Sequence, residues 1–140
     1  MRWVWCAGLI AVSGWVAGCQ QMRAYSDLRE GSYVDMSAVQ RANSGSRSWI
    51  PEWIPGTAVN IREKHNLDTN EQILRFGLGG VGLPSAACLP AALPAPPKLA
   101  AEWWPDPLPE GREYECGTDT GRQSVVVVDD DVYVWHNANR

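Results

Sequence analysis

Proline placement constrains this chain more than any other feature. Eight of its ten prolines lie between Pro84 and Pro109, and the other two are Pro51 and Pro55. A proline lacks the amide hydrogen and clashes with the preceding helical turn, so it is rare inside helices and central strands. We therefore expect residues 84–109 to form a long surface excursion with no more than one helical turn, near 86–89.

The chain has 140 residues, enough for one domain. Hydrophobic residues make up 45% and charged residues 20%, which is not the composition of a disordered protein. The formal net charge is −4. A protein that binds nucleic acid needs a basic face to neutralise phosphates, so we expect no nucleic-acid partner.

The first eighteen residues have the pattern of an export signal. Arg2 supplies one positive charge, and the run Trp3–Gly18 carries none. This run is shorter than the roughly 20 apolar residues that a membrane-spanning helix needs, and it ends in small residues. We expect 1–18 to be removed during export.

The run ends in Val16-Ala17-Gly18-Cys19, which resembles the lipobox of bacterial lipoproteins. In that family the cysteine thiol receives a diacylglyceryl group, the signal is cut before it and the new N-terminus is acylated. The resemblance implies that Cys19 is the lipidation site and that acyl chains anchor the protein on a membrane. In such lipoproteins an Asp directly after the cysteine favours retention in the inner membrane. Gln20 stands at this position instead, which indicates the outer membrane, facing the periplasm. The alternative is an ordinary secretory signal or an uncleaved anchor, with Cys19 there by chance.

Cys88 and Cys116 are the cysteines that remain after Cys6 leaves with the signal and Cys19 is lipidated. An even number in an oxidising compartment favours a disulfide between them. Free thiols are one alternative. A zinc site with the two histidines is another, but the required short spacings are absent, so we expect no metal ligand.

We expect three segments: a signal peptide at 1–18, a lipidated N-terminus and tether at 19–48, and a single domain at 49–140. The tether is polar and carries one weak helix that Asp35 caps. In the domain, we predict a short helix over 58–64.

Strand patterns dominate the rest of the domain. Residues 73–78 alternate as a strand, and 113–116, 123–128 and 132–136 predict a three-stranded antiparallel meander. Together with the helices, these elements predict the α+β class: a small antiparallel sheet, one or two short helices and a proline-rich loop.

Three patterns imitate ligand or catalytic sites. Residues 77–82 spell G-x-G-x-x-G, but the prolines that follow prevent the helix that a dinucleotide site needs. Residues 129–131 are three aspartates without the spacing of a calcium loop, so we predict a hairpin turn. His65 and Asp68 have the spacing of a helix-end hydrogen bond or, alternatively, an acid–base pair. We expect no catalytic residue, no cofactor and no metal.

Tryptophan is the most unusual part of the composition after signal removal. Such rings either fill the core and pin loops, or form a contact surface, for which the candidates are Trp49, Trp53, Trp103 and Trp104.

The body of the chain is similar to small bacterial envelope proteins described only as hypothetical lipoproteins. The stretches that carry this resemblance are 55–61, 68–70 and 103–105. We expect a non-enzymatic accessory or interaction protein with an envelope-protein partner. The alternative is a module that binds glycan or peptidoglycan fragments, and the third reading is an envelope hydrolase, for which Asp119 beside His65 would be the first sign.

Overall fold

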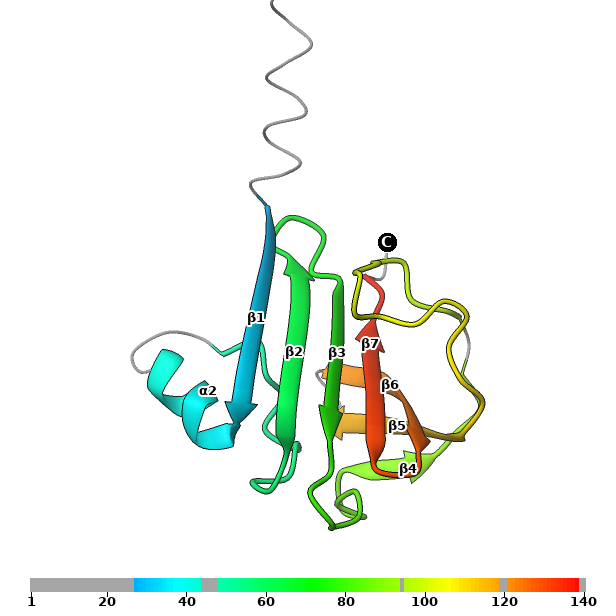
Figure 1. The fold of residues 1–140 in the computed structure, drawn as a ribbon. Helices are drawn as coiled ribbons and strands as arrows, with labels where there is room; N and C mark the ends of the chain where they lie inside the picture. Colours follow the sequence, from blue (N-terminus) through cyan, green and yellow to red (C-terminus); the bar gives the residue numbers. More distant parts are fainter. Residues whose placement is uncertain (1–26, 44–47, 94, 119–120, 139–140) are drawn as a thin grey trace, which may run out of the picture.

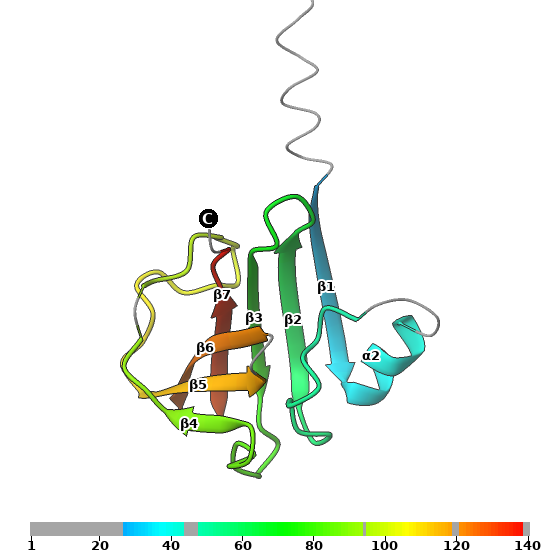
Figure 2. The same ribbon diagram turned by 180° about the vertical axis from the view of Figure 1, so that it is seen from behind.

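The computed structural model describes residues 27–43, 48–93, 95–118 and 121–138. Within them, seven strands form one antiparallel sheet in the order β1-β2-β3-β7-β6-β5-β4 (Figure 1). The sheet curls, so that β4, β5 and β6 run across the view while β1, β2 and β3 run up and down it (Figures 1 and 2). The elements are β1 (Leu28–Asp35), α2 (Met36–Ala42), β2 (Val59–Asn66), β3 (Gln72–Gly77), β4 (Cys88–Pro90), β5 (Arg112–Thr118), β6 (Gly121–Val128) and β7 (Asp131–His136).

The predicted α+β class is wrong: the fold is largely β. The described residues contain a single α-helix, α2, of seven residues. The stretch predicted as a helix, 58–64, instead runs into β2, which pairs with β1 on one side and β3 on the other.

A β-bulge explains why β2 resembles a helix in the sequence. The register shifts between Val59 and Arg62, and Asn60 between them has a φ of 51°. An extra residue at a bulge changes the alternation of side chains between the two faces. Ala58 and Ile61 therefore reach the same core cluster although they stand three residues apart. That spacing is the one a helix would show.

The segment expected to be a tether contributes to the sheet. β1 pairs along its length with β2, and α2 packs against β1. The predicted cap is confirmed, because the Asp35 carboxylate accepts a hydrogen bond of 2.8 Å from the backbone N–H of Ala38. The sheet thus begins at Leu28 rather than near residue 49. The expected signal at 1–18 and the lipidation site Cys19 lie outside the described residues.

The strand at 73–78 and the C-terminal meander are confirmed as β3 and as β5, β6 and β7. β3 joins the two halves of the sheet, because it pairs with β2 and with β7. Its side chains are buried on both faces. Leu74 and Phe76 belong to a cluster that α2 and the 48–58 segment help to cover, whereas Ile73 belongs to a second cluster on the other face.

The proline-rich excursion covers this second face. Trp104 is buried there, with its ring edge-on to Tyr133 at a centroid distance of 5.8 Å. The Trp135 indole N–H donates a hydrogen bond to the carbonyl of Ala95. The helical turn predicted near 86–89 is replaced by a turn at 85–87 that leads into β4.

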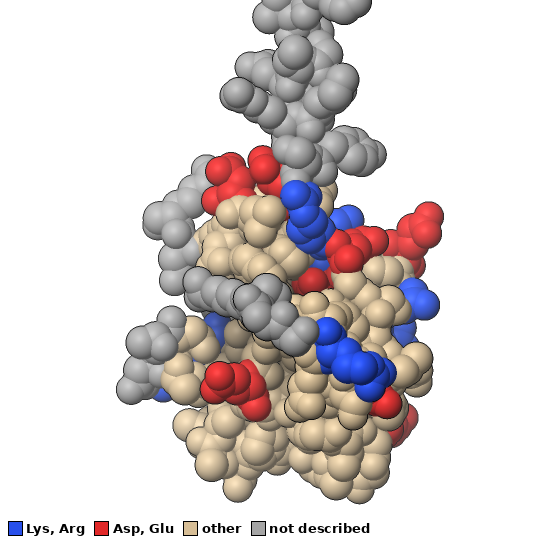
Figure 3. Space-filling view, turned by 90° about the vertical axis from the view of Figure 1, so that its left-hand side faces the viewer, with Lys and Arg blue, Asp and Glu red and all other residues tan. Residues whose placement is uncertain are grey.

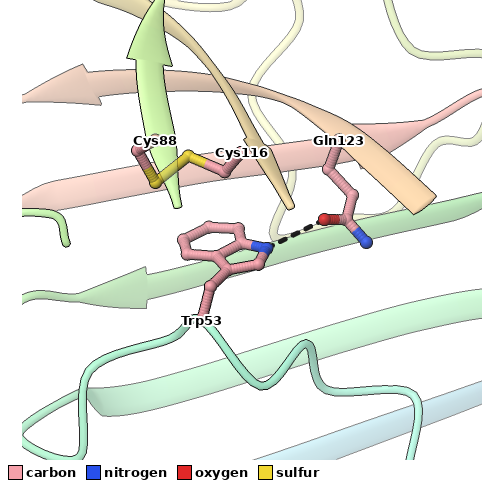
Figure 4. Close-up of a disulfide and its surroundings, with 4 residues drawn as sticks. All are labelled: Trp53, Cys88, Cys116 and Gln123. Atoms are coloured by element: carbon pink, nitrogen blue, oxygen red, sulfur yellow. Dashed lines mark hydrogen bonds between the residues drawn. A yellow bond between two sulfur atoms is a disulfide. The ribbon is translucent and has the colours of Figure 1, made fainter. Parts of the chain in front are cut away.

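A disulfide joins the two strands at the far edge of the sheet. Cys88 on β4 stands opposite Cys116 on β5 in the strand register, and their sulfur atoms are bonded, which confirms the predicted pair. Trp53 lies beside this bridge and donates its indole N–H to the side-chain oxygen of Gln123 on β6 at 2.8 Å (Figure 4). The disulfide thus ties the start of the excursion to the meander.

The helix among the described residues is too short and too polar to span a lipid bilayer.

Candidate functional site

Three polar side chains are buried in the described part of the sheet, and they lie next to one another. Glu63, His65 and Gln72 are only 4%, 5% and 6% exposed. His65 Nδ1 lies 2.8 and 3.0 Å from the two carboxylate oxygens of Glu63. A buried acid–imidazole pair costs desolvation energy, so its presence in a sheet core calls for a physical account.

Strand geometry brings the three groups together. Glu63 and His65 are two residues apart on β2, so both project to the same face. Gln72 on β3 stands opposite His65 in the register. Its side-chain amide also forms a hydrogen bond with Glu63 and donates to the backbone carbonyl of Trp49.

Trp49 packs against this group of buried polar side chains. Its ring stacks on the His65 imidazole with centroids 4.0 Å apart and planes inclined by 10°. The Gln72 side-chain amide donates a hydrogen bond to the backbone carbonyl of Trp49. Among the described residues, no buried side-chain nitrogen or oxygen lacks a hydrogen-bond partner. We call Trp49, Glu63, His65 and Gln72 the Trp49 network.

Burial raises the pKa of Glu63 above its ordinary value of 4.5. The hydrogen bond and charge of His65 and the hydrogen bond from Gln72 act in the opposite direction, and the like charge of Glu30 adds to the rise. Desolvation therefore outweighs the partners. A catalytic acid or base must reach the proton it transfers, and this pair is enclosed beneath the Trp49 ring. Its place in the fold is that of a support for Trp49.

An open cleft lies beside the Trp49 network, at the end of the sheet where β3 and β6 begin and β7 ends. Its volume is about 450 Å³. Gln123 and His136 line it from β6 and β7, and Asn70 lines it from the turn between β2 and β3. The remaining lining residues are Ser48, Trp49, Ile50, Pro51, Leu67, Gln72 and Gly121. We call this space the Trp49 cleft.

The four candidate contact tryptophans do not form one exposed surface. Trp104 is buried at 6% exposure, and Trp49, Trp53 and Trp103 are partly buried. Trp53 packs on Phe76, and Trp103 meets Trp104 edge-on. Trp53 packs against the cluster on one face of the sheet, and Trp103 and Trp104 belong to the cluster on the other. Trp49 stacks on His65, which shares the face of Ile61 and therefore of Trp53. The packing of Trp53, Trp103 and Trp104 is that of rings that fill the core or pin loops, whereas Trp49 lines the cleft.

The glycine motif holds a carboxylate of this chain. Gly79 and Gly80 have φ angles of 70° and 87°, and their N–H groups point to the two side-chain oxygens of Asp130 at 3.4 Å. A β-carbon at Gly79 would lie 2.2 Å from the carbonyl oxygen of Thr57. Within the described residues after the motif there is no helix, as the prolines predicted.

The predicted hairpin turn lies between β6 and β7: Asp129 and Asp130 form it, and Asp131 is the first residue of β7. Asp131 pairs with Arg75 at 3.5 Å, while Asp130 faces the glycines. Groups of three or more potential metal ligands do not occur among the described residues.

His65 pairs with Glu63 and not with Asp68, so the predicted helix-end contact is wrong. Asp68 lies in the turn after β2, where its N–H donates to the side chain of Asn66. Asp119 lies outside the described residues. The helix that the sequence predicts over 58–64 gives no reason to pair Glu63 with His65, because residues two apart do not face each other on a helix. In a strand, the spacing of two puts both side chains on one face.

Charges on the edge of the molecule are mixed in sign. Figure 3 faces β1 and α2, and acidic and basic side chains are interspersed there. Glu30 on β1 and Lys64 on β2 face each other at 3.4 Å. This face therefore offers no single-sign surface.

The described part of the chain is thus a curled antiparallel sheet with an edge disulfide and a small polar cleft. Residues 25–77 match the family model of the YbbD head domain, a bacterial family. This stretch includes β1, α2, β2 and β3 and ends before β4. It contains the whole Trp49 network, but not β6 and β7, which supply the other wall of the cleft. Neither the curated proteins nor the solved structures include a match.

Proposed function

We propose that this protein is an exported, lipid-anchored protein of the bacterial envelope that acts by binding rather than by catalysis. Export and anchoring are supported by the lipobox pattern that ends at Cys19. Within the fold, the Cys88–Cys116 disulfide is the observation that most supports export, because such bridges persist in oxidising compartments and are rare in the cytosol. The similarity of residues 25–77 to a bacterial family agrees with it.

The accessory role is supported by the arrangement of the Trp49 network. Its one acid–imidazole pair is covered by an indole ring, so the pair serves packing rather than proton transfer. The third reading, an envelope hydrolase that uses His65, is disfavoured for this reason. Placement on the outer membrane, facing the periplasm, follows from Gln20 and belongs to the same proposal.

Intact-mass measurement of protein purified from a membrane fraction tests the anchor. We expect a chain that begins at Cys19, carries acyl mass and gains the mass of one reduced disulfide in reductant. Cys19→Ser should abolish the acyl mass and release the protein from membranes. Cys6→Ser, which alters a cysteine within the signal, is the matched control and should be processed normally. A chain that is unacylated or still begins at Met1 would contradict the anchor.

Glycan binding is the second candidate function. It is favoured by one specific observation, the polar Trp49 cleft, which places an aromatic ring beside amide and imidazole groups.

A further inference from the structure

We infer that the Trp49 cleft is a binding site for an uncharged saccharide, an assignment that rests on glycan binding as the role of the domain. Ligand sites in proteins combine apolar or aromatic walls with a few converging polar groups. The cleft has this composition: Trp49, Ile50 and Leu67 supply apolar surface, and three polar side chains face it from other elements.

The aromatic wall is held in place before any ligand arrives. Trp49 stacks on His65, and the Gln72 amide fixes its backbone carbonyl. Glu63 in turn holds His65 through two short contacts. A ring that is already ordered loses little conformational entropy on binding, so more of the contact energy becomes affinity. The buried side chains of the Trp49 network therefore have a role in this site, because they hold the indole ring of Trp49 at the cleft.

The polar groups of the cleft keep unused hydrogen-bonding capacity. Gln123 accepts from the Trp53 indole through its oxygen, which leaves the two N–H donors of its amide. In Figure 4 this amide nitrogen points away from Trp53. His136 Nδ1 lies 3.3 Å from the backbone carbonyl of Arg122. When Nδ1 carries the ring hydrogen and donates it to this carbonyl, Nε2 is an acceptor. Asn70 adds an amide with both capacities.

This set selects the chemical class of the ligand. None of the residues that line the cleft is Lys, Arg, Asp or Glu. A phosphate or carboxylate would therefore lose its hydration without gaining a charged partner. Sugar hydroxyls donate and accept, which matches the amides and the imidazole, and the C–H face of a pyranose ring packs on an aromatic wall. The volume of about 450 Å³ lies in the range of small-ligand sites.

The test is an NMR titration of the protein purified from membranes in detergent micelles, with N,N′-diacetylchitobiose and cellobiose as probes. We expect saturable shifts of the Trp49 indole N–H and of the backbone signals of Asn70, Gln123 and His136. His136→Ala and Asn70→Gly should each weaken binding roughly three- to tenfold, the size of one lost hydrogen bond. The glycine suits the left-handed backbone of Asn70, whose φ is 60°. Trp103→Phe, on the opposite face, should leave the affinity unchanged.

Three outcomes would overturn the site. The first is the absence of saturable shifts with both saccharides, and the second is shifts centred on Trp103 instead of Trp49. The third is an unchanged affinity in both His136→Ala and Asn70→Gly. Acyl mass on Cys19 is measured on the same sample, so loss of the saccharide site is separated from loss of the anchor. Saturable binding that maps elsewhere would retain glycan binding and exclude the cleft.

Discussion

Glu63 occupies a position where a strand in a sheet core normally carries an apolar side chain. Its neighbours on the same face are Ile61 and His65, and Leu74 stands opposite it on β3. The carboxylate is satisfied by His65 and Gln72, so it is not an isolated buried charge. Burial nevertheless raises its pKa, which means that the fold pays a desolvation cost whenever Glu63 is ionised.

The stability of Glu63→Gln relative to the wild type should therefore increase as the pH rises. Because the folded-state pKa of Glu63 lies above 4.5, the folded protein holds this proton more tightly than the unfolded chain. The resulting stabilisation is complete below the unfolded pKa and is lost as the pH rises through the folded pKa. Glutamine does not ionise and escapes this loss. Urea unfolding of both proteins at several values between about pH 4 and pH 7 measures the difference.

The control for this titration is Glu102→Gln, at an exposed carboxyl on the excursion. Because Glu102 is exposed, this variant removes the same charge without altering a buried group, so it measures the effect of the substitution itself. A difference for Glu63→Gln that does not change with pH would contradict the raised pKa.

At the scale of elements, β3 is the strand on which both core clusters depend. Parallel sheets usually bury both faces, whereas an antiparallel strand commonly has one face in water. β3 is antiparallel but buried on both faces, because α2 and the 48–58 segment cover one face and the proline-rich excursion covers the other. Its run of Gln72, Ile73 and Leu74 is consequently buried without alternation.

Truncation on either face of β3 should be equally damaging. Ile73 and Leu74 are both fully buried, so Ile73→Ala and Leu74→Ala should each lower the free energy of unfolding by about 2–5 kcal/mol. Leu89→Ala, at a side chain that is 58% exposed, should change it by less than about 0.5 kcal/mol. Urea unfolding measures all three. A loss at Ile73 as small as that at Leu89 would mean that the excursion does not pack on its face.

At the scale of the whole molecule, the disulfide and the start of β1 lie at opposite edges of the sheet. The disulfide joins β4 to β5, and β1 begins at the other edge. With Cys19 as the lipidated residue, the eight residues 20–27 would separate the lipid from Leu28, a reach of at most about 30 Å. The proposed anchor would thus keep the domain close to the membrane surface. The turn between β2 and β3 lies at the end of the sheet where β1 starts (Figure 1), and Leu67 and Asn70 of this turn line the cleft.

Removing the disulfide should destabilise the molecule strongly. Cys88 and Cys116 are 28 positions apart, and opening a loop of this length is expected to cost about 3–4 kcal/mol in the loop-entropy description. Unfolding of the Cys88→Ala/Cys116→Ala double variant, compared with the wild type without reductant, measures this loss. Reductant should destabilise the wild type and leave the double variant unchanged. An equal response of both proteins would show that the reductant acts elsewhere.

The sequence by itself determined the features that follow from local rules. The β-branched run of β6 and the turn of three aspartates predicted the meander, because strand preference and turn chemistry act between neighbouring residues. Asp35 predicted the start of α2, because a cap needs only its own side chain and the next turn. The number of cysteines predicted the Cys88–Cys116 pair, because these two remain once Cys6 is assigned to the expected signal and Cys19 to the expected lipidation site.

The tertiary structure alone decided the features that need partners far apart in the chain. β1 is a strand because β2, some thirty residues later, pairs with it. The bulge at Asn60 interrupts the alternation of side chains between the two faces of β2. The sequence pattern alone therefore does not identify this strand, and its pairing with β1 and β3 does. The Trp49 network joins residues from a loop and two strands. Their shared face depends on sheet register, which a list of residues does not contain.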